Sequence, residues 1–530
     1  MKAKQLTPFE LKAFLLKLLN KINSVDDIKD CLDDFDVLDN QATNDFIAKI
    51  LFKELVNASV EKIPVICFLL ERYVPKNEFI SKLWETLKQQ KLSNEVKITI
   101  LNLLRDLDSD WSYETCEEFL EDAESLLDEN TKQLLKSAII NPETQIDFMD
   151  FLTTLRTQDK ITLLNSFVGE YTDDAFANIL VPVFVSNPSS PEGKEALKLL
   201  ANTKSQIALH TLEEIQHIAT DELLQEVKRS LSTLKISGIR VDNTKEFYTQ
   251  ILSNSKVKDC YITYPDGHGD CALIFTRITT DNKIRFVSIV INLQNGIKDC
   301  FGFFDISEFE CNKIIERFLK NESAIKISAE TFKTVLYNSE MTTIKNNQNN
   351  WQLPYEYVCW KNLLIDIDYD TRSYVQIIDE LFKNIKLSEF NMTQFYSSEV
   401  CTHWFLDINY SQEFQELLKQ LSSNDNINVL LKTSLDKVFN TAEKEDWKNR
   451  LYLSAYLKYS IDKIDETKNI YKLLNTEEIL QKLFLTILQR SVYEYLLLVK
   501  YDRTIDKFGL THEQIEDKIN YIEKKWILNE

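Results

Sequence analysis

The chain has 530 residues, of which 44% are hydrophobic, and 62 basic against 83 acidic residues give a formal net charge of −21. A chain this acidic repels phosphate backbones, which argues against general nucleic-acid binding. No uncharged apolar run approaches the roughly 18 residues of a membrane span, and the nine cysteines form no Cys-x-x-Cys pair, so we expect a cytoplasmic protein with reduced thiols and no membrane partner.

Glycine is scarce and unevenly placed. The chain contains only eight glycines, and Gly267, Gly269, Gly296 and Gly302 fall within one window of 36 residues. Because glycine supplies the positive φ angles that tight turns require, so few glycines cannot serve many hairpins. The composition therefore predicts a mainly α-helical protein with one small β-rich insertion.

From about residue 7 to residue 234, apolar residues recur with the 3.6-residue period of α-helices. One helical pattern, with mostly apolar or small residues at the third, fourth and seventh positions after its start, recurs at intervals of 33, 35, 29, 33 and 34 residues. Its copies start at Ile63, Val96, Thr131, Lys160, Gly193 and Val227. A period of this length with two helices per unit is typical of an α-solenoid, in which helix pairs bury their apolar faces by stacking.

The best-preserved copies, at residues 95–97 and 226–231, read Glu-Val-Lys and Glu-Val-Lys-Arg-Ser-Leu. They resemble the second helix of HEAT-like repeats, in which a valine followed by a basic residue accompanies a stripe of alanine and leucine. The resemblance extends over residues 40–236 and implies a HEAT-like α-solenoid in a first domain of residues 1–238. The alternative is an irregular helical bundle whose helices have similar lengths.

The predicted helix of residues 112–127 carries a concentration of acidic side chains. Six of them occupy the side opposite its apolar residues and form six like-charge pairs three or four positions apart. Their repulsion costs on the order of 1–3 kcal/mol before screening by salt. A partner protein with a basic surface would relieve it, and the alternative is a face that only keeps the protein soluble. This acidic face consists of Glu114, Glu117, Glu118, Glu121, Asp122 and Glu124.

Residues 239–322 are expected to form a small α+β module with a four-stranded antiparallel β-meander. Strands are predicted at residues 259–264, 270–278, 285–293 and 297–304, and a capped helix at 307–320. The Asn295-Gly296 pair between two apolar runs is typical of a type I′ hairpin turn. Because the third strand is apolar on both sides, the sheet needs helices on both faces. The module resembles small β-units of uncharacterised bacterial helical-repeat proteins, a resemblance that implies no activity.

The loop before the second strand contains Asp266, His268 and Asp270. Residues 267–272 match the Gly-x-Gly-x-x-Ala pattern of dinucleotide-binding proteins, but that pattern requires a helix to follow, and a strand is predicted instead. We therefore expect no nucleotide cofactor. The three side chains either meet at the tip of the loop, where they would form a metal or catalytic site, or are solvated residues of a turn.

Helical periodicity returns after residue 323, and residues 323–530 are predicted to form a helical C-terminal domain. Residues 366–370 begin like a calcium-binding loop, but Thr371 and Ile377 stand where such a loop has glycine and glutamate. In the first domain, Glu214 and His217 form one Glu-x-x-His turn with His210 before it, whereas a di-iron site requires two such turns. We predict no metal, no cofactor and no catalytic residue.

The sequence favours a non-enzymatic cytoplasmic scaffold that binds another protein through an extended helical-repeat surface. The alternative is an enzyme whose site lies at the 266–270 loop, where the module meets the helices. The two hypotheses differ in geometry, because an enzyme at this loop needs Asp266, His268 and Asp270 to converge on an open pocket.

Overall fold

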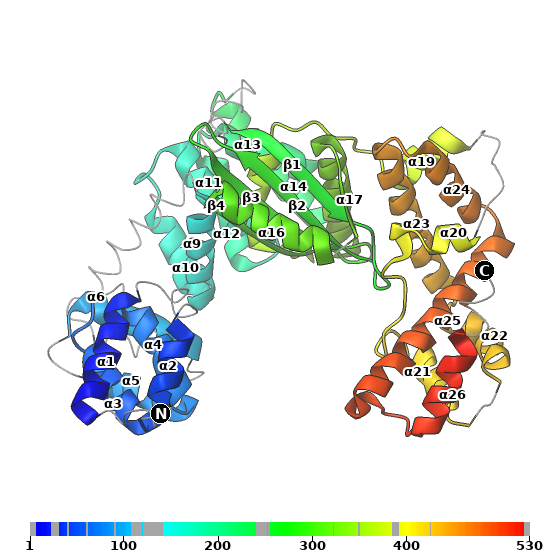
Figure 1. Ribbon diagram of the computed structural model, residues 1–530. Coiled ribbons are helices and arrows are strands. Elements are labelled where there is room, and N and C mark those ends of the chain that lie inside the picture. Colours follow the sequence, from blue (N-terminus) through cyan, green and yellow to red (C-terminus); the bar gives the residue numbers. More distant parts are fainter. Residues whose placement is uncertain are drawn as a thin grey trace. The chain divides into compact units, whose positions relative to one another are not determined.

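The computed structural model describes residues 7–22, 31–39, 42–59, 62–88, 92–107, 119, 141–239, 252, 255–321, 323–347, 350–383, 392–423 and 426–523. The chain divides into two compact units, Met1–Gln133 and Leu134–Glu530. The described residues are mostly helical and contain a five-stranded antiparallel sheet (Figure 1), which confirms the predicted fold class at that level. No described helix combines the length and the apolar character that crossing a lipid bilayer requires.

Helices that pack on their neighbours in sequence form the described part of the first unit. Its apolar faces share one core, which includes Leu15, Leu51 and Leu70. Thr7 caps the first helix, because its hydroxyl accepts a hydrogen bond from the Glu10 amide while the Glu10 carboxylate accepts one from the Thr7 amide. The helices are α1 (Pro8–Lys21), α2 (Leu32–Asp39), α3 (Asn44–Leu55), α4 (Ile63–Tyr73), α5 (Lys76–Leu87) and α6 (Asn94–Leu107).

The second unit opens with two layers of helices, which we call the helical array. Its members are α9 (Pro142–Thr154), α10 (Thr157–Ser166), α11 (Asp173–Ser186), α12 (Pro191–Asn202), α13 (Gln206–Gln216) and α14 (Asp221–Ile236). Contacts link α9, α11 and α13 in one layer and α10, α12 and α14 in the other, and α11–α12 and α13–α14 contacts join the layers. Three copies of the repeating stripe lie in α10, α12 and α14, where Leu164, Leu197 and Leu231 are buried.

The sheet has the strand order β4-β3-β2-β1-β5, and every neighbouring pair is antiparallel. Its strands are β1 (Lys256–Thr263), β2 (Asp270–Ile278), β3 (Lys283–Asn292), β4 (Gly296–Ser307) and β5 (Ala324–Lys326). The four predicted strands are confirmed. The fifth was not predicted, because a strand of three residues is too short to show an alternating pattern.

The hairpin between β3 and β4 is confirmed, but its turn is of a different type from the one predicted. A type I′ turn needs positive φ at both central residues, whereas Gly296 has a φ of 86° and Asn295 does not have a positive φ. Asn292 pairs with Gly296 across a three-residue loop, and its Oδ1 accepts hydrogen bonds from the amides of Gln294 and Asn295. Gly296 is therefore the left-handed residue of a longer turn that the Asn292 side chain stabilises.

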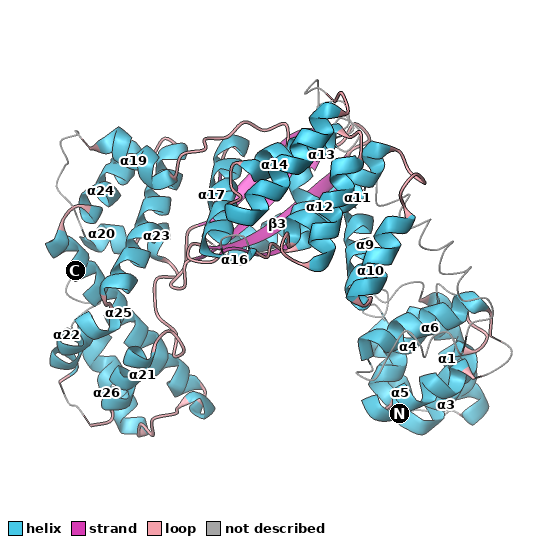
Figure 2. Ribbon diagram, turned by 180° about the vertical axis from the view of Figure 1, so that it is seen from behind, coloured by secondary structure: helices cyan, strands magenta, loops and turns pink. Residues whose placement is uncertain are grey.

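Helices cover both faces of the sheet, as its two-sided apolar pattern predicts. On one face α16 (Glu308–Asn321) packs Cys311 and Ile315 near Ile274 and Phe286 (Figure 1). On the other face α17 (Ala329–Asn347) and α18 (Tyr355–Trp360) contact the strands, and α18 also contacts α9 and α11. From behind, α11–α14 lie in front of the sheet (Figure 2). One hydrophobic core therefore includes residues of the helical array and of the sheet, and it spans the predicted boundary after residue 238.

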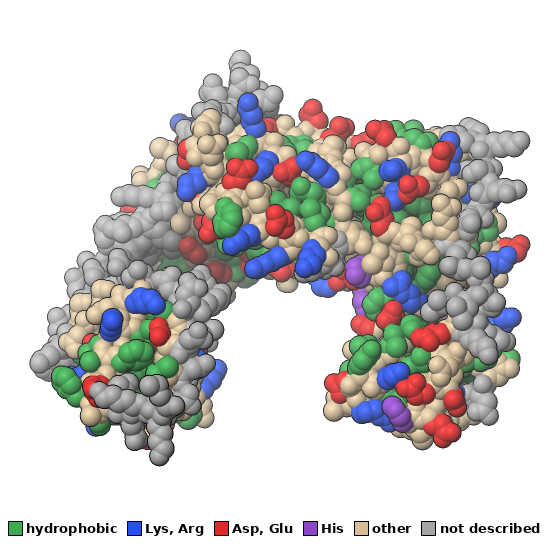
Figure 3. Space-filling model, viewed as in Figure 1, with side chains coloured by type: hydrophobic (Ala, Val, Ile, Leu, Met, Phe, Trp, Pro, Cys, Tyr) green, Lys and Arg blue, Asp and Glu red, His purple; other side chains and the backbone are tan. Residues whose placement is uncertain are grey.

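Basic side chains gather along α16 (Figure 3), where Lys313, Arg317 and Lys320 are exposed. The ammonium of Lys313 lies 4.4 Å from the centre of the exposed Phe309 ring. The same helix exposes Glu308, Glu310 and Glu316, so its formal net charge is zero.

The remaining helices form the C-terminal part of the second unit, which confirms the helical character predicted there. Their core is rich in aromatic residues: the rings of Trp404 and Trp447 meet edge-on at 5.3 Å, and those of Phe439 and Phe484 stack at 4.9 Å. Aromatic pairs favour both arrangements. The elements are η4 (Lys361–Leu364), α19 (Tyr374–Phe382), α20 (Met392–Tyr396), η5 (Glu399–Cys401), α21 (Gln412–Gln420), α22 (Ile427–Val438), α23 (Thr441–Ser460), α24 (Ile464–Leu474), α25 (Glu477–Tyr501), η6 (Arg503–Ile505) and α26 (His512–Ile522).

Candidate functional site

The predicted acidic face lies outside the described residues. Its six members, Glu114, Glu117, Glu118, Glu121, Asp122 and Glu124, belong to the stretches 108–118 and 120–140. Its role in partner binding stays a prediction.

The 266–270 loop joins β1 to β2 and is fixed by hydrogen bonds. Asp266 Oδ1 accepts from the amides of His268 (2.8 Å) and Asp270 (2.9 Å). The Asp270 carboxylate accepts from Asn292 Nδ2 (2.6 Å) and forms an ion pair with Lys298 (2.6 Å). Both acids are therefore engaged in holding the turn and the neighbouring strands.

His268 pairs with a different segment. Its Nε2 lies 2.8 Å from Oδ2 of Asp407, and its ring centre lies 6.0 Å from that of Tyr410. The three predicted site residues thus contact different groups. Within the described ranges, no three histidine, cysteine, aspartate or glutamate side chains gather in a way that could hold a metal ion.

The loop also docks the sheet against the C-terminal helical part. The Gly267 amide donates a hydrogen bond to the carbonyl of His403 (3.0 Å), and Trp404 Nε1 donates one to the carbonyl of Pro265 (2.8 Å). A Cβ at Gly267 would collide with the carbonyl oxygen of Phe405. This glycine therefore permits the close approach of two backbones, and a strand follows the loop, as predicted.

A cavity of about 810 Å³ opens between the helical array and α17. One wall comes from α11 and α13, and the other comes from α17, α18, η4 and residues 365–371. The size of the cavity and its mixture of apolar and polar groups are typical of binding sites for small molecules. It is the candidate site that the structure adds to those predicted from the sequence.

Glu340 of α17 is a well-compensated charge in the cavity wall. Its carboxylate lies 2.9 Å from the Lys361 ammonium and accepts a hydrogen bond of 2.7 Å from the Tyr357 hydroxyl. Burial opposes the charge of Lys361, but the Glu340 and Glu214 carboxylates outweigh it and raise the pKa of Lys361. Glu340 and Lys361 therefore act as a neutral pair.

Lys333 of α17 is held by a carbonyl group and an aromatic ring. Its ammonium donates to the carbonyl of Ile367 (2.6 Å) and lies 4.6 Å from the centre of the Tyr369 ring. Burial lowers the pKa of Lys333, and the Glu214 carboxylate opposes that effect. The Tyr337 ring lies 5.0 Å from the Tyr369 ring, so two tyrosine rings stand beside the lysine.

Two other carboxylates, Glu214 of α13 and Asp368, line the cavity and are exposed, and neither forms an ion pair with a lysine or arginine of the described residues. Glu214 lies 3.7 Å from Nδ1 of His210, and 54% of its side chain is exposed. With its histidines neutral, the wall has three acids and two lysines and a formal charge of −1. These residues are Glu214, Glu340, Asp368, Lys333 and Lys361.

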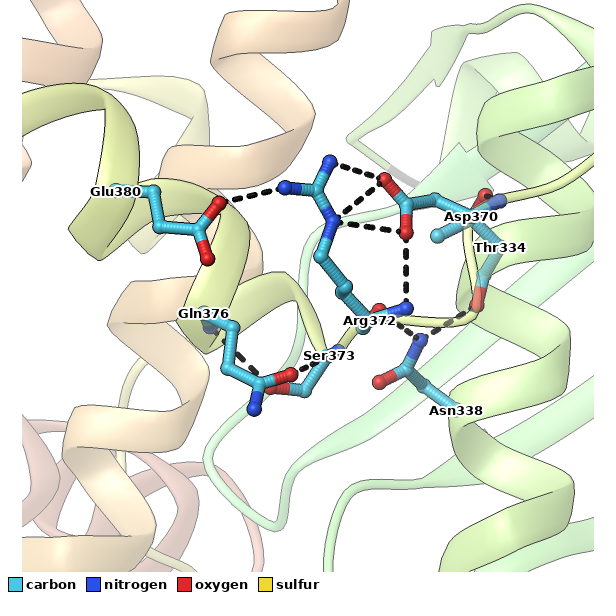
Figure 4. Close-up of polar contacts among 7 residues, drawn as sticks. All are labelled: Thr334, Asn338, Asp370, Arg372, Ser373, Gln376 and Glu380. Carbon is cyan, nitrogen blue, oxygen red and sulfur yellow. Dashed lines mark hydrogen bonds and ion pairs between the residues drawn. The ribbon is translucent and has the colours of Figure 1, made fainter.

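Residues 365–373, which we call the connecting segment, lead from η4 to α19 and contribute to two cavities. Asp370 and Arg372 line a second cavity of about 360 Å³, together with residues of α19 and α23. Figure 4 shows how the segment is held: Arg372 bridges Asp370 and Glu380, and its carbonyl accepts a hydrogen bond of 3.3 Å from Asn338 of α17. The segment is thereby tied to both neighbouring helices.

No protein-family model, curated protein or solved structure matches the chain. The candidate site therefore rests on geometry. Sequence patterns singled out Glu214, His210 and His217 of its lining, as a Glu-x-x-His turn with a preceding histidine, but gave no sign that residues 333–371 face them.

Proposed function

We propose that this chain is a non-enzymatic cytoplasmic interaction protein, which binds another protein through the surface of a HEAT-like helical array. The observation that carries the proposal is the position of the cavity, because α11 and α13, which belong to one layer of the array, form one of its walls. Helical-repeat proteins bind their partners on extended surfaces made by stacked helices. The cavity would then receive a part of the partner.

Contacts within the array support the repeat interpretation. Helices α9, α11 and α13 contact one another in order, as do α10, α12 and α14. Stacked helix pairs are expected to give this pattern, because each unit contacts the next one. The predicted period places three of its copies in a single layer of the array, in α10, α12 and α14.

The acidic face is a second proposed contact. Neutralising Glu114, Glu117, Glu118 and Glu121 together should weaken binding of a basic partner, because their charges attract it and repel one another. Unchanged affinity would remove this face from the proposal.

The second candidate function, an enzyme at the 266–270 loop, is favoured by the pair of His268 and Asp407, since a carboxylate can orient an imidazole for general-base chemistry. Asp266 and Asp270 have other partners, so this function has less support. We expect His268→Ala to leave binding of a protein partner unchanged.

Site-specific photo-crosslinking tests the interaction proposal. The photoreactive residue p-benzoylphenylalanine is placed at His217, an exposed residue of the cavity wall, and in a control at Lys228, an exposed residue of α14. After irradiation in an extract of the source cells, we expect discrete protein adducts from the His217 position only. They should disappear when Ile218→Trp narrows the cavity in a variant whose fold is verified by circular dichroism.

Two results would contradict the proposal. One is an absence of protein adducts at His217, and the other is an identical set of adducts in the narrowed variant.

A further inference from the structure

The cavity wall carries negative charge that its own side chains do not compensate. Glu340 and Lys361 cancel each other through their ion pair of 2.9 Å. The other charged residues of the wall are two acids, Glu214 and Asp368, and one base, Lys333. Lys333 contacts a carbonyl group and an aromatic ring, and it forms no ion pair with a carboxylate of the described residues. One formal negative charge therefore remains among the described lining residues, on exposed carboxylates that a ligand entering the cavity can reach.

The same cavity offers aromatic faces. Tyr337 and Tyr369 both line it, and their ring centres are 5.0 Å apart. Burial raises the pKa of both hydroxyls, so the two residues remain neutral at pH 7. An electron-rich ring attracts an ammonium or guanidinium group, most strongly where water is partly excluded.

We propose, building on the function proposed above, that the cavity binds an organic cation, namely a primary ammonium or guanidinium group on an apolar body. The cation contacts the carboxylates of Glu214 and Asp368 and lies against the Tyr337 ring, while the body packs against Leu336 and Met341. A small amine and a lysine or arginine side chain of a partner protein both offer this chemistry.

An anionic ligand fits the wall less well. Among the described lining residues, Lys333 is the lysine without a carboxylate partner, and it already donates to the Ile367 carbonyl; Glu214 and Asp368 would repel an anion. Binding of an anion is therefore the outcome that most directly opposes the proposal.

The test compares three probes that share a phenyl ring on a short chain and differ in charge: phenethylamine, 2-phenylethanol and 3-phenylpropionate. Each is titrated into the full-length protein and followed by saturation-transfer difference NMR. We expect phenethylamine to bind most tightly and 3-phenylpropionate least tightly. Glu214→Gln should weaken phenethylamine binding roughly tenfold, because a hydrogen bond to a charged group is lost.

Glu213→Gln is the matched control. Glu213 directly precedes Glu214 in α13, but it pairs with Lys235 at 3.0 Å and is not among the residues that line the cavity. Equal losses in the Glu213 and Glu214 variants would overturn the proposal. So would binding of 3-phenylpropionate as tight as that of the amine, or no binding by any cationic probe.

A peptide arm separates the two sources of the cation. Acetyl-Ala-Lys-Ala-amide is compared with the same peptide carrying norleucine in place of lysine. Binding of the lysine peptide without phenethylamine identifies a protein side chain as the source, and the reverse identifies a small amine; either result supports an ammonium ligand.

Failure of this inference can be distinguished from failure of the proposed function. If protein adducts at His217 persist in a Glu214→Gln, Asp368→Asn double variant, the protein-binding proposal stands and the cation proposal falls. If phenethylamine binds and no protein adduct forms at His217, the cation proposal stands and the protein-binding proposal falls.

Discussion

Replacing Arg277 with methionine removes a buried guanidinium near the end of β2. The side chain is 3% exposed and donates hydrogen bonds to both carboxylate oxygens of Asp366 at 2.8 Å. It also donates to the Leu363 carbonyl (2.9 Å) and to the hydroxyl and carbonyl of Ser255 (3.0 and 3.1 Å). Arg277 therefore fixes the start of the connecting segment to the sheet.

The magnitude follows from these five hydrogen bonds. A hydrogen bond contributes about 1 kcal/mol net, a bond to a charged group contributes more, and a buried carbonyl that loses its donor adds a further penalty. Asp366 is 41% exposed, so water solvates its carboxylate in the variant and the loss of the ion pair is discounted. We expect Arg277→Met to lower the free energy of unfolding by about 3 kcal/mol, at the low end for breaking a buried pair.

Urea unfolding followed by tryptophan fluorescence measures the change, and Arg372→Met provides the control. Arg372 also bridges two acids, Asp370 and Glu380, but 51% of its side chain is exposed. We expect its unfolding midpoint to stay at that of the unaltered protein, because exposed ion pairs contribute little. An Arg372 variant as destabilised as the Arg277 variant, or an unchanged midpoint for Arg277→Met, would refute this reasoning.

Three further predictions follow from other contacts. Burial alone would raise the pKa of Asp366, but hydrogen bonding by Arg277 lowers it below its ordinary value. The carboxylate therefore stabilises the fold at pH values above its unfolded pKa of about 3.9. The stability difference between the unaltered protein and Asp366→Asn, measured in urea, should be constant from about pH 8 to pH 5 and shrink below about pH 4. Gly302→Ala should destabilise the second unit by about 2 kcal/mol in the same assay, since its Cβ would lie 2.6 Å from the Trp360 ring and from the Phe286 carbonyl; an unchanged midpoint would contradict that packing. In a Cys116→Ser variant, the eight remaining cysteines are all buried, and burial raises the pKa of Cys67 and Cys260 to about 12. Ellman's reagent should therefore react slowly with this variant until urea is added. Rapid labelling of the native variant would contradict the prediction.

The strands were predictable because their signals are local. Residues 270–278 include the β-branched and aromatic run Ile274-Phe275-Thr276 and follow a glycine-containing turn, and β2 has those bounds. The type of the β3–β4 turn was not predictable in the same way. It depends on the Asn292 side chain, which accepts hydrogen bonds from two amides of the turn, and a dipeptide signal such as Asn-Gly does not include that residue.

The cavity could not be predicted, because its chemistry is shared between distant segments. Its lining comes from residues 178–218 and 333–371. In the sequence, Glu214 has the pattern of a solvated residue on a helix surface. Lys333 and Tyr337 have the pattern of residues at the border between the apolar and polar sides of another helix. Periodicity shows which side of each helix is apolar, but it does not show which two helices face each other.

The change in composition after residue 238 marks the change from helices to strands. The two compact units, Met1–Gln133 and Leu134–Glu530, divide at a different place in the chain. A sheet that is apolar on both faces cannot stand alone, because each face must be covered. One face is covered by α16, whereas the other is covered by α17 and α18, and α18 in turn contacts α9 and α11. The helical array and the sheet thus share one core, and the cavity lies where α13 and α17 leave that core incompletely filled. Glu214 and Asp368 are exposed, so water solvates them when no ligand is bound. The case for a ligand therefore depends on their charge together with the neighbouring rings of Tyr337 and Tyr369, which line the same cavity.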